Sequence, residues 1–361
     1  WGVSDGRGSG EVSGVILEDK ENYLSIDSFI TEIKHSGKDI LFVTNSPRPK
    51  SDLLKILQER GFRNITEDML VTSGDVARSV IYEYGCSVLR DSKFNSYLTI
   101  TKKNQENTNY NSSTKPITIY HLGKEYNTEL LHNFVTDNDL KYNFRETNVI
   151  AEADIILLSL YRDGVAKKNE MIESHKVNEI LHALKSKDND DSVDLEYNPY
   201  YPQDRLEEDS RLIKEIVKSR AIIICSNPDI IVPRFDRIRY CSGYFAAILE
   251  KKGRYVIYTG KPKAEIFQKA ISLYIKNRSL SASDIANQKR NIIMIGDTIE
   301  TDIVGANNFA EENIDSCLVL GGNARRYYQA NNDINDKIRS IENVIRDCRE
   351  RPRYVFEGFK K

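Results

Sequence analysis

The stretch NIIMIGDTIETD, residues 291–302, joins a short apolar run to a turn that carries acidic groups. NIIMI has the length and composition of a buried β-strand, and the GDTIETD that follows it is polar. In open parallel sheets, ligands bind beyond the carboxyl ends of the strands. Asp297, and Asp302 five residues later, would stand at that position. Taken alone, this pair fits equally well with acids that cap a helix and interact with its dipole.

Two further polar turns follow apolar runs elsewhere in the chain. DILFV (39–43) predicts a strand, and Thr44 and Asn45 come directly after it. The tripeptide Gly-Lys-Pro follows YVIYT and places Lys261 just before a helix predicted over 264–276. Either turn has a plain structural explanation, because glycine, proline and short polar residues are common where a turn starts a helix.

The three turns together supply a hydroxyl, an amide, an ammonium and two carboxylates. A phosphomonoester site needs this mixture. Hydroxyl and backbone N–H groups bind phosphoryl oxygens, and a lysine ammonium offsets their negative charge. Carboxylates hold Mg²⁺, which prefers oxygen ligands. The order and spacing therefore favour a phosphate site over three unrelated turns.

Strand–turn–helix grammar at both ends of the chain predicts an α/β fold with a parallel sheet. We predict a discontinuous outer domain, residues 1–78 and 259–361, and an inserted α/β domain, residues 79–258. Two polar tracts, near 102–115 and 185–210, interrupt the insertion and are expected to be solvated loops or disordered insertions. The strands expected in the insertion are TIYHL (118–122), DIILLSL (154–160) and AIIIC (221–225).

Length and composition limit the classes of function that this protein can have. A chain of 361 residues is long enough for about two domains. The net charge of −2 gives no basic excess for nucleic acid or a membrane surface, and no apolar run is long enough to span a bilayer. Five cysteines without a CxxC pair indicate reduced thiols, so we expect a cytoplasmic protein. The five histidines show no metal-ligand spacing.

The motifs resemble those of the haloacid dehalogenase (HAD) superfamily, and most closely its subfamily IIA, the NagD-type and p-nitrophenylphosphatase-like enzymes with an inserted α/β cap. The resemblance covers most of the chain and implies a Rossmann-like core, a smaller cap domain, Mg²⁺ as cofactor and hydrolysis of a small phosphorylated metabolite. It rests on TNSPRP (44–49), TSGD (72–75), SNPDIIVP (226–233), YCSGYFAAILEKKG (240–253) before Gly-Lys-Pro, GDTIETDIVGA (296–306) and RPRYVF (351–356).

The resemblance implies roles for the polar residues of these motifs. Thr44 would bind the phosphoryl group, with Asn45 supporting it. Lys261 would neutralise the phosphate and the nucleophile. Asp297 would coordinate Mg²⁺, and Asp302 would order the metal's waters or pair with Lys261.

The predicted substrate contacts come from two segments. Ser46 lies in the second motif, and Asn227 and Asp229 lie in the cap segment SNPD. The two cap residues are equally compatible with a polar turn around a proline. We also allow for a homodimer formed through the cap.

The first family motif departs from its usual form. In the subgroup it reads Asp-x-Trp-Gly-Val, and this chain opens with WGVSDG. The nucleophilic aspartate is therefore expected just upstream of Trp1, whose backbone carbonyl would ligate Mg²⁺. Most HAD phosphatases have an aspartate acid/base at that position, and an indole cannot donate a proton in the same way. The alternative nucleophile, Asp5, follows too short a segment for a buried strand and would place Arg7 at the acid/base position.

Two other functions stay open from the sequence. One is a catalytically impaired phosphate-binding or regulatory protein on the same fold, which Trp1 and the acidic insertion favour. The other is a dinucleotide-dependent enzyme, which lacks support because no GxGxxG follows a predicted strand.

Overall fold

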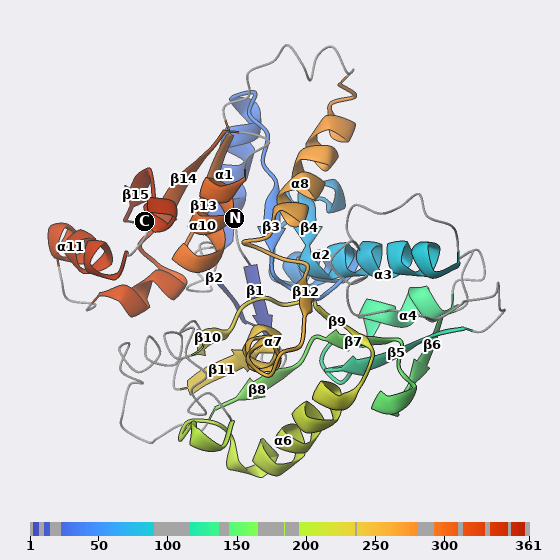
Figure 1. Cartoon of the computed structure of the whole chain (residues 1–361). Helices are drawn as coiled ribbons and strands as arrows, with labels where there is room; N and C mark the ends of the chain where they lie inside the picture. Colours follow the sequence, from blue (N-terminus) through green and yellow to red (C-terminus); the bar gives the residue numbers. More distant parts are fainter. Residues whose placement is uncertain are drawn as a thin grey trace.

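The computed structural model is an α/β structure with several parallel strand pairings (Figure 1). It describes residues 3–6, 11–14, 23–89, 116–136, 144–164, 184, 195–234, 237–280, 292–309, 313–328, 333–345 and 348–357. No helix in these ranges is long and apolar enough to cross a membrane.

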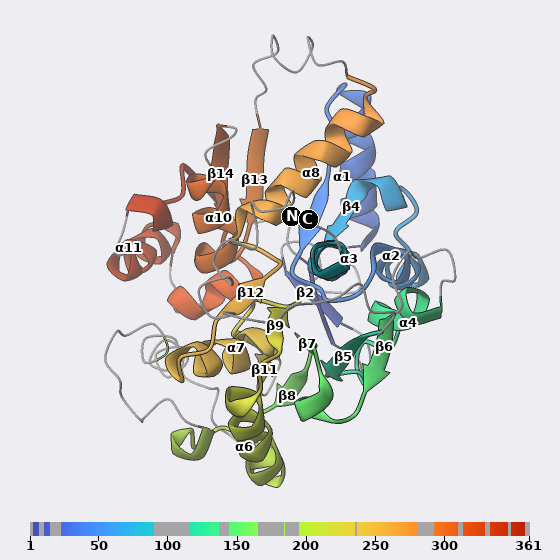
Figure 2. The same ribbon diagram turned by 45° about the vertical axis from the view of Figure 1, so that its right-hand side comes forward.

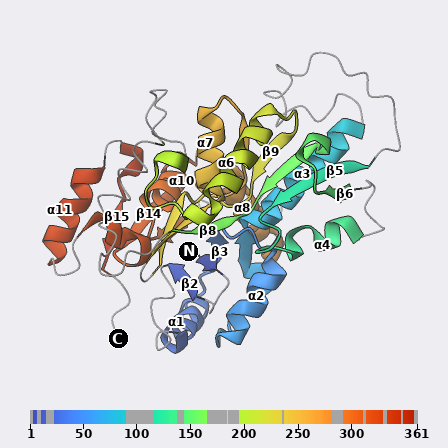
Figure 3. The same cartoon turned by 90° about the horizontal axis from the view of Figure 1, so that it is seen from below.

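A five-stranded parallel sheet occupies the middle of the chain, in the order β12-β9-β7-β5-β6. Helices α6 and α7 pack on one face, and α3 and α4 pack on the other (Figure 3). Runs such as IILL in β7 are buried along their whole length, as a sheet covered on both faces requires. The strands are β5 (Ile117–Leu122), β6 (Phe144–Thr147), β7 (Ile155–Leu158), β9 (Ile222–Cys225) and β12 (Val256–Tyr258).

A smaller antiparallel sheet follows the carboxyl ends of β7 and β9. Its order is β10-β11-β8, with bounds β8 (Tyr161–Asp163), β10 (Ile231–Arg234) and β11 (Arg237–Cys241). Arg239 in β11 donates two hydrogen bonds to the Asp163 carboxylate in β8, at 2.6 and 2.9 Å. The loop between β9 and β10 contains the SNPD segment.

Strands from both ends of the chain form a second group (Figure 2). β3 pairs in parallel with β4, and β14 pairs in parallel with both β13 and β15. Val43 of β3 and Met294 of β13 belong to one hydrophobic cluster, so the two pairings share a core. The strands are β3 (Phe42–Thr44), β4 (Leu70–Thr72), β13 (Ile292–Gly296), β14 (Ile314–Val319) and β15 (Tyr354–Phe356).

The helix predicted over 264–276 forms as α8 (Ala264–Asn277). Gly37, with φ of 74°, lies two residues beyond α1, where only glycine adopts the left-handed backbone without strain. The helices are α1 (Tyr23–His35), α2 (Lys50–Glu59), α3 (Ser73–Leu89), α4 (Glu129–Thr136), α6 (Gln203–Lys218), α7 (Ser242–Lys251), α8 (Ala264–Asn277), α10 (Val304–Asn308) and α11 (Ile334–Val344). A hairpin of β1 (Val3–Gly6) and β2 (Glu11–Gly14) precedes them.

The expectation of a solvated loop does not hold for residues 195–210. Tyr201 is fully buried among aromatic rings, with its centroid 5.4 Å from that of Tyr240. Asp209, in the first half of α6, is also fully buried and accepts two hydrogen bonds from Arg162, at 2.8 and 2.9 Å. The tract was predicted to be a solvated loop because of its acidic composition, and this composition gave no sign of the helix's apolar face. Residues 102–115 and 185–194 lie outside the described residues.

The α/β fold class agrees with the sequence prediction. The exact division into residues 1–78 with 259–361 and residues 79–258 stays a proposal. The placement of β12 in the middle sheet supports it, because this strand ends at Tyr258.

Candidate active site

The predicted polar residues gather at the carboxyl ends of the parallel strands. Thr44 is the last residue of β3, and Asp297 directly follows β13. Lys261 comes three residues after β12, at the edge of the five-stranded sheet. The hydrogen bonds described below connect these segments into one buried cluster, the site cluster, comprising Thr44, Asn45, Lys261, Asp297 and Asp302.

Lys261 and Asp302 form a buried ion pair. Lys261 Nζ lies 2.6 Å from Asp302 Oδ1, and it also donates to the backbone carbonyl of Val43 at 3.0 Å. The lysine therefore links the end of β3 to the turn after β13. Its ammonium is buried in a low-dielectric setting, where its electric field on a nearby anion would be stronger than in water.

Asp302 also fixes the turn that carries Asp297. Its Oδ2 accepts the backbone N–H groups of Asp297 and Thr298, both at 3.1 Å. A side chain at Gly296 would collide with this carboxylate, since a Cβ there would lie 2.2 Å from Asp302 Cγ. Both oxygens of Asp302 thus have partners, which supports the pairing role that the resemblance offered as one of two alternatives.

Asp297 is buried, and its partners are neutral donors. Its Oδ1 accepts from Thr298 Oγ1 at 3.1 Å, and its Oδ2 accepts from the backbone N–H of Asn323 at 2.9 Å. Burial, followed by the negative charge of Asp302, raises the pKa of Asp297 to about 7. The charge of Lys261 counteracts this rise only partly, because the ammonium is bonded to Asp302.

This arrangement fits a divalent cation. A buried carboxylate with a raised pKa is costly to ionise, and a bound positive ion stabilises its charged form. Asp297 is therefore the first candidate ligand. Within the described ranges no group of three or more His, Cys, Asp or Glu side chains is arranged to hold a metal. The predicted ligand Trp1 lies outside them.

The turn after β3 is held by its own side chains. Thr44 Oγ1 accepts the backbone N–H of Ser46 at 3.1 Å, and Ser46 Oγ accepts that of Arg48 at 3.3 Å. Asn45 bonds to the backbone of Lys261 in both directions: its Oδ1 accepts from N at 2.7 Å, and its Nδ2 donates to O at 3.1 Å. Asn45 thus joins two of the predicted motifs.

The two predicted residues of the SNPD loop have different partners. Asp229 Oδ1 accepts from Asn45 Nδ2 at 2.9 Å, so this carboxylate touches the site cluster. Asn227 is buried and donates from Nδ2 to the Tyr161 hydroxyl at 3.1 Å. Burial raises the pKa of Tyr161 above its ordinary value, so this phenol stays protonated at neutral pH.

Asn323 and Arg48 are neighbours of the site that the sequence reasoning missed. Asn323 donates its backbone N–H to Asp297 and its side-chain amide to Thr298 Oγ1, the latter at 2.9 Å. The glycine pair that ends the strand before it was the available signal, because it marks another strand end at the same edge. Arg48 is buried, and burial lowers its pKa. Nothing in the spacing of TNSPRP distinguishes it from a surface arginine.

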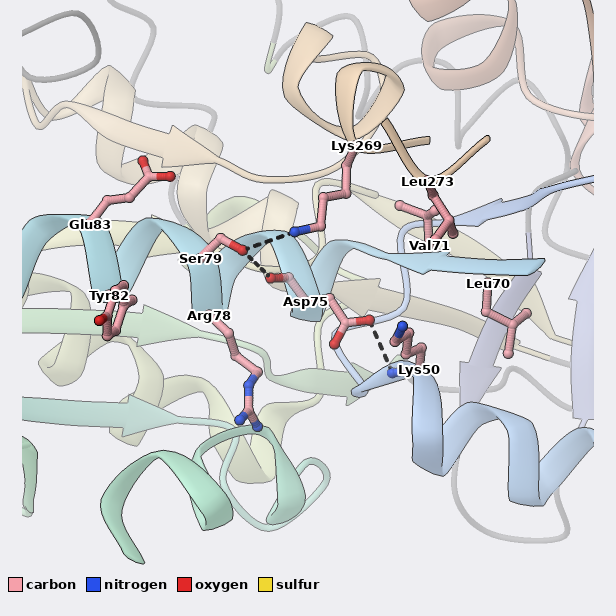
Figure 4. Close-up of a pocket in the computed structure, with 10 residues that line it drawn as sticks. All are labelled: Lys50, Leu70, Val71, Asp75, Arg78, Ser79, Tyr82, Glu83, Lys269 and Leu273. Carbon is pink, nitrogen blue, oxygen red and sulfur yellow. Dashed lines mark hydrogen bonds between the residues drawn. The ribbon is translucent and has the colours of Figure 1, made fainter. Parts of the chain in front are cut away.

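A separate cavity of about 440 Å³ lies between α3 and α8, beside β4 (Figure 4). Its lining includes Lys50, Asp75, Ser79 and Lys269, and no member of the site cluster. The Asp75 carboxylate accepts from Thr72 Oγ1 at 3.0 Å and from the backbone N–H of Lys50 at 3.2 Å. Burial raises the pKa of Asp75. Asp75 therefore holds the start of α3 against the start of α2, away from the chemistry.

Comparison with protein families matches two segments of the chain. A haloacid dehalogenase-like hydrolase model matches residues 11–96, and a HAD-hydrolase-like model matches residues 258–350. The segments carry the second motif and the Lys261 and Asp297 motifs, respectively. No curated protein sequence matches the chain.

Several solved structures share the fold. A haloacid dehalogenase-like hydrolase from Brucella suis 1330 is 23% identical, with 92% of this chain and 88% of that one covered and a TM-score of 0.51. A possible sugar phosphatase of the HAD superfamily from Cytophaga hutchinsonii is 18% identical, with coverage of 92% and 86% and a TM-score of 0.54. A p-nitrophenyl phosphatase from Archaeoglobus fulgidus is 17% identical, with coverage of 92% and 88% and a TM-score of 0.50. These likenesses support the fold predicted from the motifs.

Proposed function

Since this chain belongs to the haloacid dehalogenase-like hydrolases, we propose that it is a Mg²⁺-dependent phosphatase acting on small phosphomonoesters. One observation carries the proposal. A buried ammonium, Lys261, and a buried carboxylate with a raised pKa, Asp297, are held in one cluster at the ends of parallel strands. The folds shared with a possible sugar phosphatase and a p-nitrophenyl phosphatase agree with this substrate class.

Each residue of the site cluster has a separate role in the proposed reaction. Thr44 binds the phosphoryl group through its hydroxyl. Lys261 offsets the charge of the phosphate and the nucleophile, and Asp302 holds that ammonium in place. Asp297 would hold Mg²⁺, which would supply charge neutralisation at the phosphoryl group.

The nucleophile of the proposed reaction is an aspartate, as the resemblance to the family implies. Its carboxylate oxygen attacks phosphorus, the alcohol leaves, and water then hydrolyses the aspartyl-phosphate. The strand pattern is consistent with a nucleophile on one more parallel strand: in the described residues β3 pairs only with β4, and β13 pairs only with β14. A further parallel strand between β3 and β13 would join the two sheets and end beside Thr44 and Asp297. The alternative Asp5 belongs instead to the antiparallel β1–β2 hairpin.

The leaving group sets a constraint on useful substrates. The departing oxygen needs a proton unless it is a weak base, and the indole of Trp1 is not an acid at neutral pH. Esters with acidic leaving groups, such as p-nitrophenyl phosphate, should therefore react faster than alkyl phosphates of similar size. The loop that carries Asn227 and Asp229 would face the organic part of the substrate.

Release of inorganic phosphate from a panel of phosphomonoesters tests the proposal. The full-length protein with Mg²⁺ should release phosphate from at least one sugar phosphate or from p-nitrophenyl phosphate. Lys261→Met is the matched control, because it removes the ammonium and keeps most of the side-chain volume. Binding of phosphate without turnover of any ester would instead favour a phosphate-binding or regulatory protein.

A further inference from the structure

Asn45 uses every hydrogen-bonding group of its side chain within the protein. Its two N–H groups serve Asp229 Oδ1 at 2.9 Å and the Lys261 carbonyl at 3.1 Å, and its carbonyl accepts the Lys261 N–H at 2.7 Å. Asn45 is also 3% exposed. This amide therefore has no N–H left for a phosphate. Its contacts are with the carboxylate of Asp229 and with the backbone carbonyl and N–H of Lys261.

We infer that Asp229 is a positioning residue, which acts through Asn45 to hold the backbone of Lys261. Asp229 orients the Asn45 amide, and the amide clamps both backbone groups of Lys261. The side chain of Lys261 then reaches Asp302 and the carbonyl of Val43. The effect on catalysis rests on the proposed phosphatase function. The clamp, which consists of the hydrogen bonds from Asp229 through Asn45 to the Lys261 backbone, does not depend on it.

Asp229 suits this role because its loop is fixed from the side of the five-stranded sheet. The backbone carbonyl of Asp229 accepts the N–H of Gly243, at the start of α7, at 3.2 Å. Its backbone N–H donates to Asn227 Oδ1 at 3.2 Å, and Asn227 in turn donates to Tyr161. The carboxylate is thus carried on a braced loop, so it can fix the orientation of the asparagine.

Close packing at Gly260 shows how tightly the three segments meet. A Cβ at Gly260 would lie 2.4 Å from Asn45 Oδ1 and 2.8 Å from Pro228 Cδ. Asn45, the Pro228 ring and the residue before Lys261 therefore occupy one contact point. A small displacement of the loop that carries Pro228 and Asp229 would therefore also displace Lys261. We thus expect the position of this loop to set the position of the lysine.

Amide hydrogen exchange tests the clamp without any turnover. The Lys261 N–H should exchange about tenfold faster in Asp229→Ala than in the wild type, because loss of one of its three hydrogen bonds holds the Asn45 amide less firmly. In Asn45→Ala it should exchange faster still. Asp229→Asn keeps an acceptor oxygen and should stay within about twofold of the wild type. Asp163→Ala, which removes the two hydrogen bonds from Arg239 in β11 to β8, is the matched control and should leave this amide unchanged.

Steady-state kinetics test the consequence for the reaction. Asp229→Ala should lower kcat about tenfold and change KM less than twofold, and Asp229→Asn should restore most of the activity. The double variant Asn45→Ala/Asp229→Ala should be no slower than Asn45→Ala alone, because both residues act along one path. A purely structural loss would appear as a lower melting temperature without this kcat pattern.

Three outcomes would overturn the inference. They are unchanged exchange of the Lys261 amide in Asp229→Ala, a rise in KM at constant kcat, and additive effects in the double variant. A rise in KM would identify Asp229 as a substrate contact instead. If the protein hydrolyses no ester, the proposed function fails, and the exchange experiment still decides whether Asp229 holds Lys261.

Discussion

The ammonium of Lys261 lies 2.6 Å from a carboxylate oxygen of Asp302, and the two side chains are 3% and 1% exposed. Forming a buried ion pair costs desolvation energy, which is recovered only when the remaining donors and acceptors are also satisfied. Here the Val43 carbonyl accepts a second ammonium hydrogen, and two backbone N–H groups donate to the other oxygen of Asp302. The pair is therefore a fixed part of the fold as well as a charge placed at the site.

Breaking this pair from one side should cost much of the protein's stability. Asp302→Leu leaves the Lys261 ammonium buried without its counter-charge, and we expect the free energy of unfolding to fall by about 3–5 kcal/mol. The double variant Lys261→Met/Asp302→Leu removes both charges and should recover at least half of that loss. Urea denaturation of the wild type and the variants measures both effects. Equal stability of the single and double variants would show that the buried charge is not the cause.

The sequence predicted the fold class because the signals for it are local. The apolar runs IIMI and AIIIC form the parallel strands β13 and β9. β9 is buried along its whole length, whereas β13, which was also expected to be buried, leaves Ile293 exposed. The order of motifs then located the polar turns at strand ends. The helical apolar stripe over 264–276 identified α8 in the same way. Periods of 3.6 and 2 residues are readable without any tertiary information.

The contacts within the site were not readable, because they join residues far apart in the chain. Asn45 and Asp229 are 184 positions apart, and no local pattern pairs a second-motif amide with that carboxylate. The same holds for Asn323, which reaches Asp297 only because β13 and β14 are adjacent. Tyr201 was assigned to a polar tract, yet it packs against rings that lie about 40 residues further along the chain.

The raised pKa of Asp297 predicts a pH-dependent stability for the metal-free protein. The folded state binds this proton up to about pH 7, whereas an unfolded aspartate loses it near its ordinary value of 3.8. Between these two pH values the folded state holds more protons, so the free energy of unfolding should fall as the pH rises. Asp297→Asn removes the titration and should flatten this part of the profile. A wild-type slope that persists in the variant would assign it to another group.

Magnesium should act on the same carboxylate in a pH-dependent way. A cation favours the ionised form, so Mg²⁺ should raise the melting temperature more at pH 7.5 than at pH 5. Thermal denaturation with and without Mg²⁺ at both pH values measures the difference. In Asp297→Asn the difference should disappear. An unchanged effect of Mg²⁺ in this variant would place the metal elsewhere.

Gly260 should tolerate no side chain. Gly260→Ala would bring a methyl group within 2.4 Å of Asn45 Oδ1 and against the Pro228 ring, so the turn before Lys261 has to shift. We expect a loss of about 1–3 kcal/mol in stability and at least a tenfold loss of activity. Urea denaturation and steady-state kinetics measure the two effects. Wild-type activity in this variant would show that the contact is not tight.

The buried Arg162–Asp209 pair should anchor the segment before α6. Asp209→Ala leaves the guanidinium buried and also removes the acceptor of the Tyr201 hydroxyl, which lies 2.6 Å away. We expect the free energy of unfolding to fall by about 3–5 kcal/mol. Tyr201→Phe removes one hydrogen bond alone and should cost about 1–2 kcal/mol. If both variants lost the same amount, the ion pair would contribute nothing beyond that bond.

The rate of phosphate release from p-nitrophenyl phosphate, followed through a Mg²⁺ titration, tests the central claim most directly. The full-length wild-type protein should show a rate that rises with Mg²⁺ to saturation and falls to background with EDTA. Asp297→Asn should lose at least a hundredfold of that rate at every Mg²⁺ concentration, because it removes a charged ligand from the metal. A rate that survives both EDTA and Asp297→Asn unchanged would contradict the account.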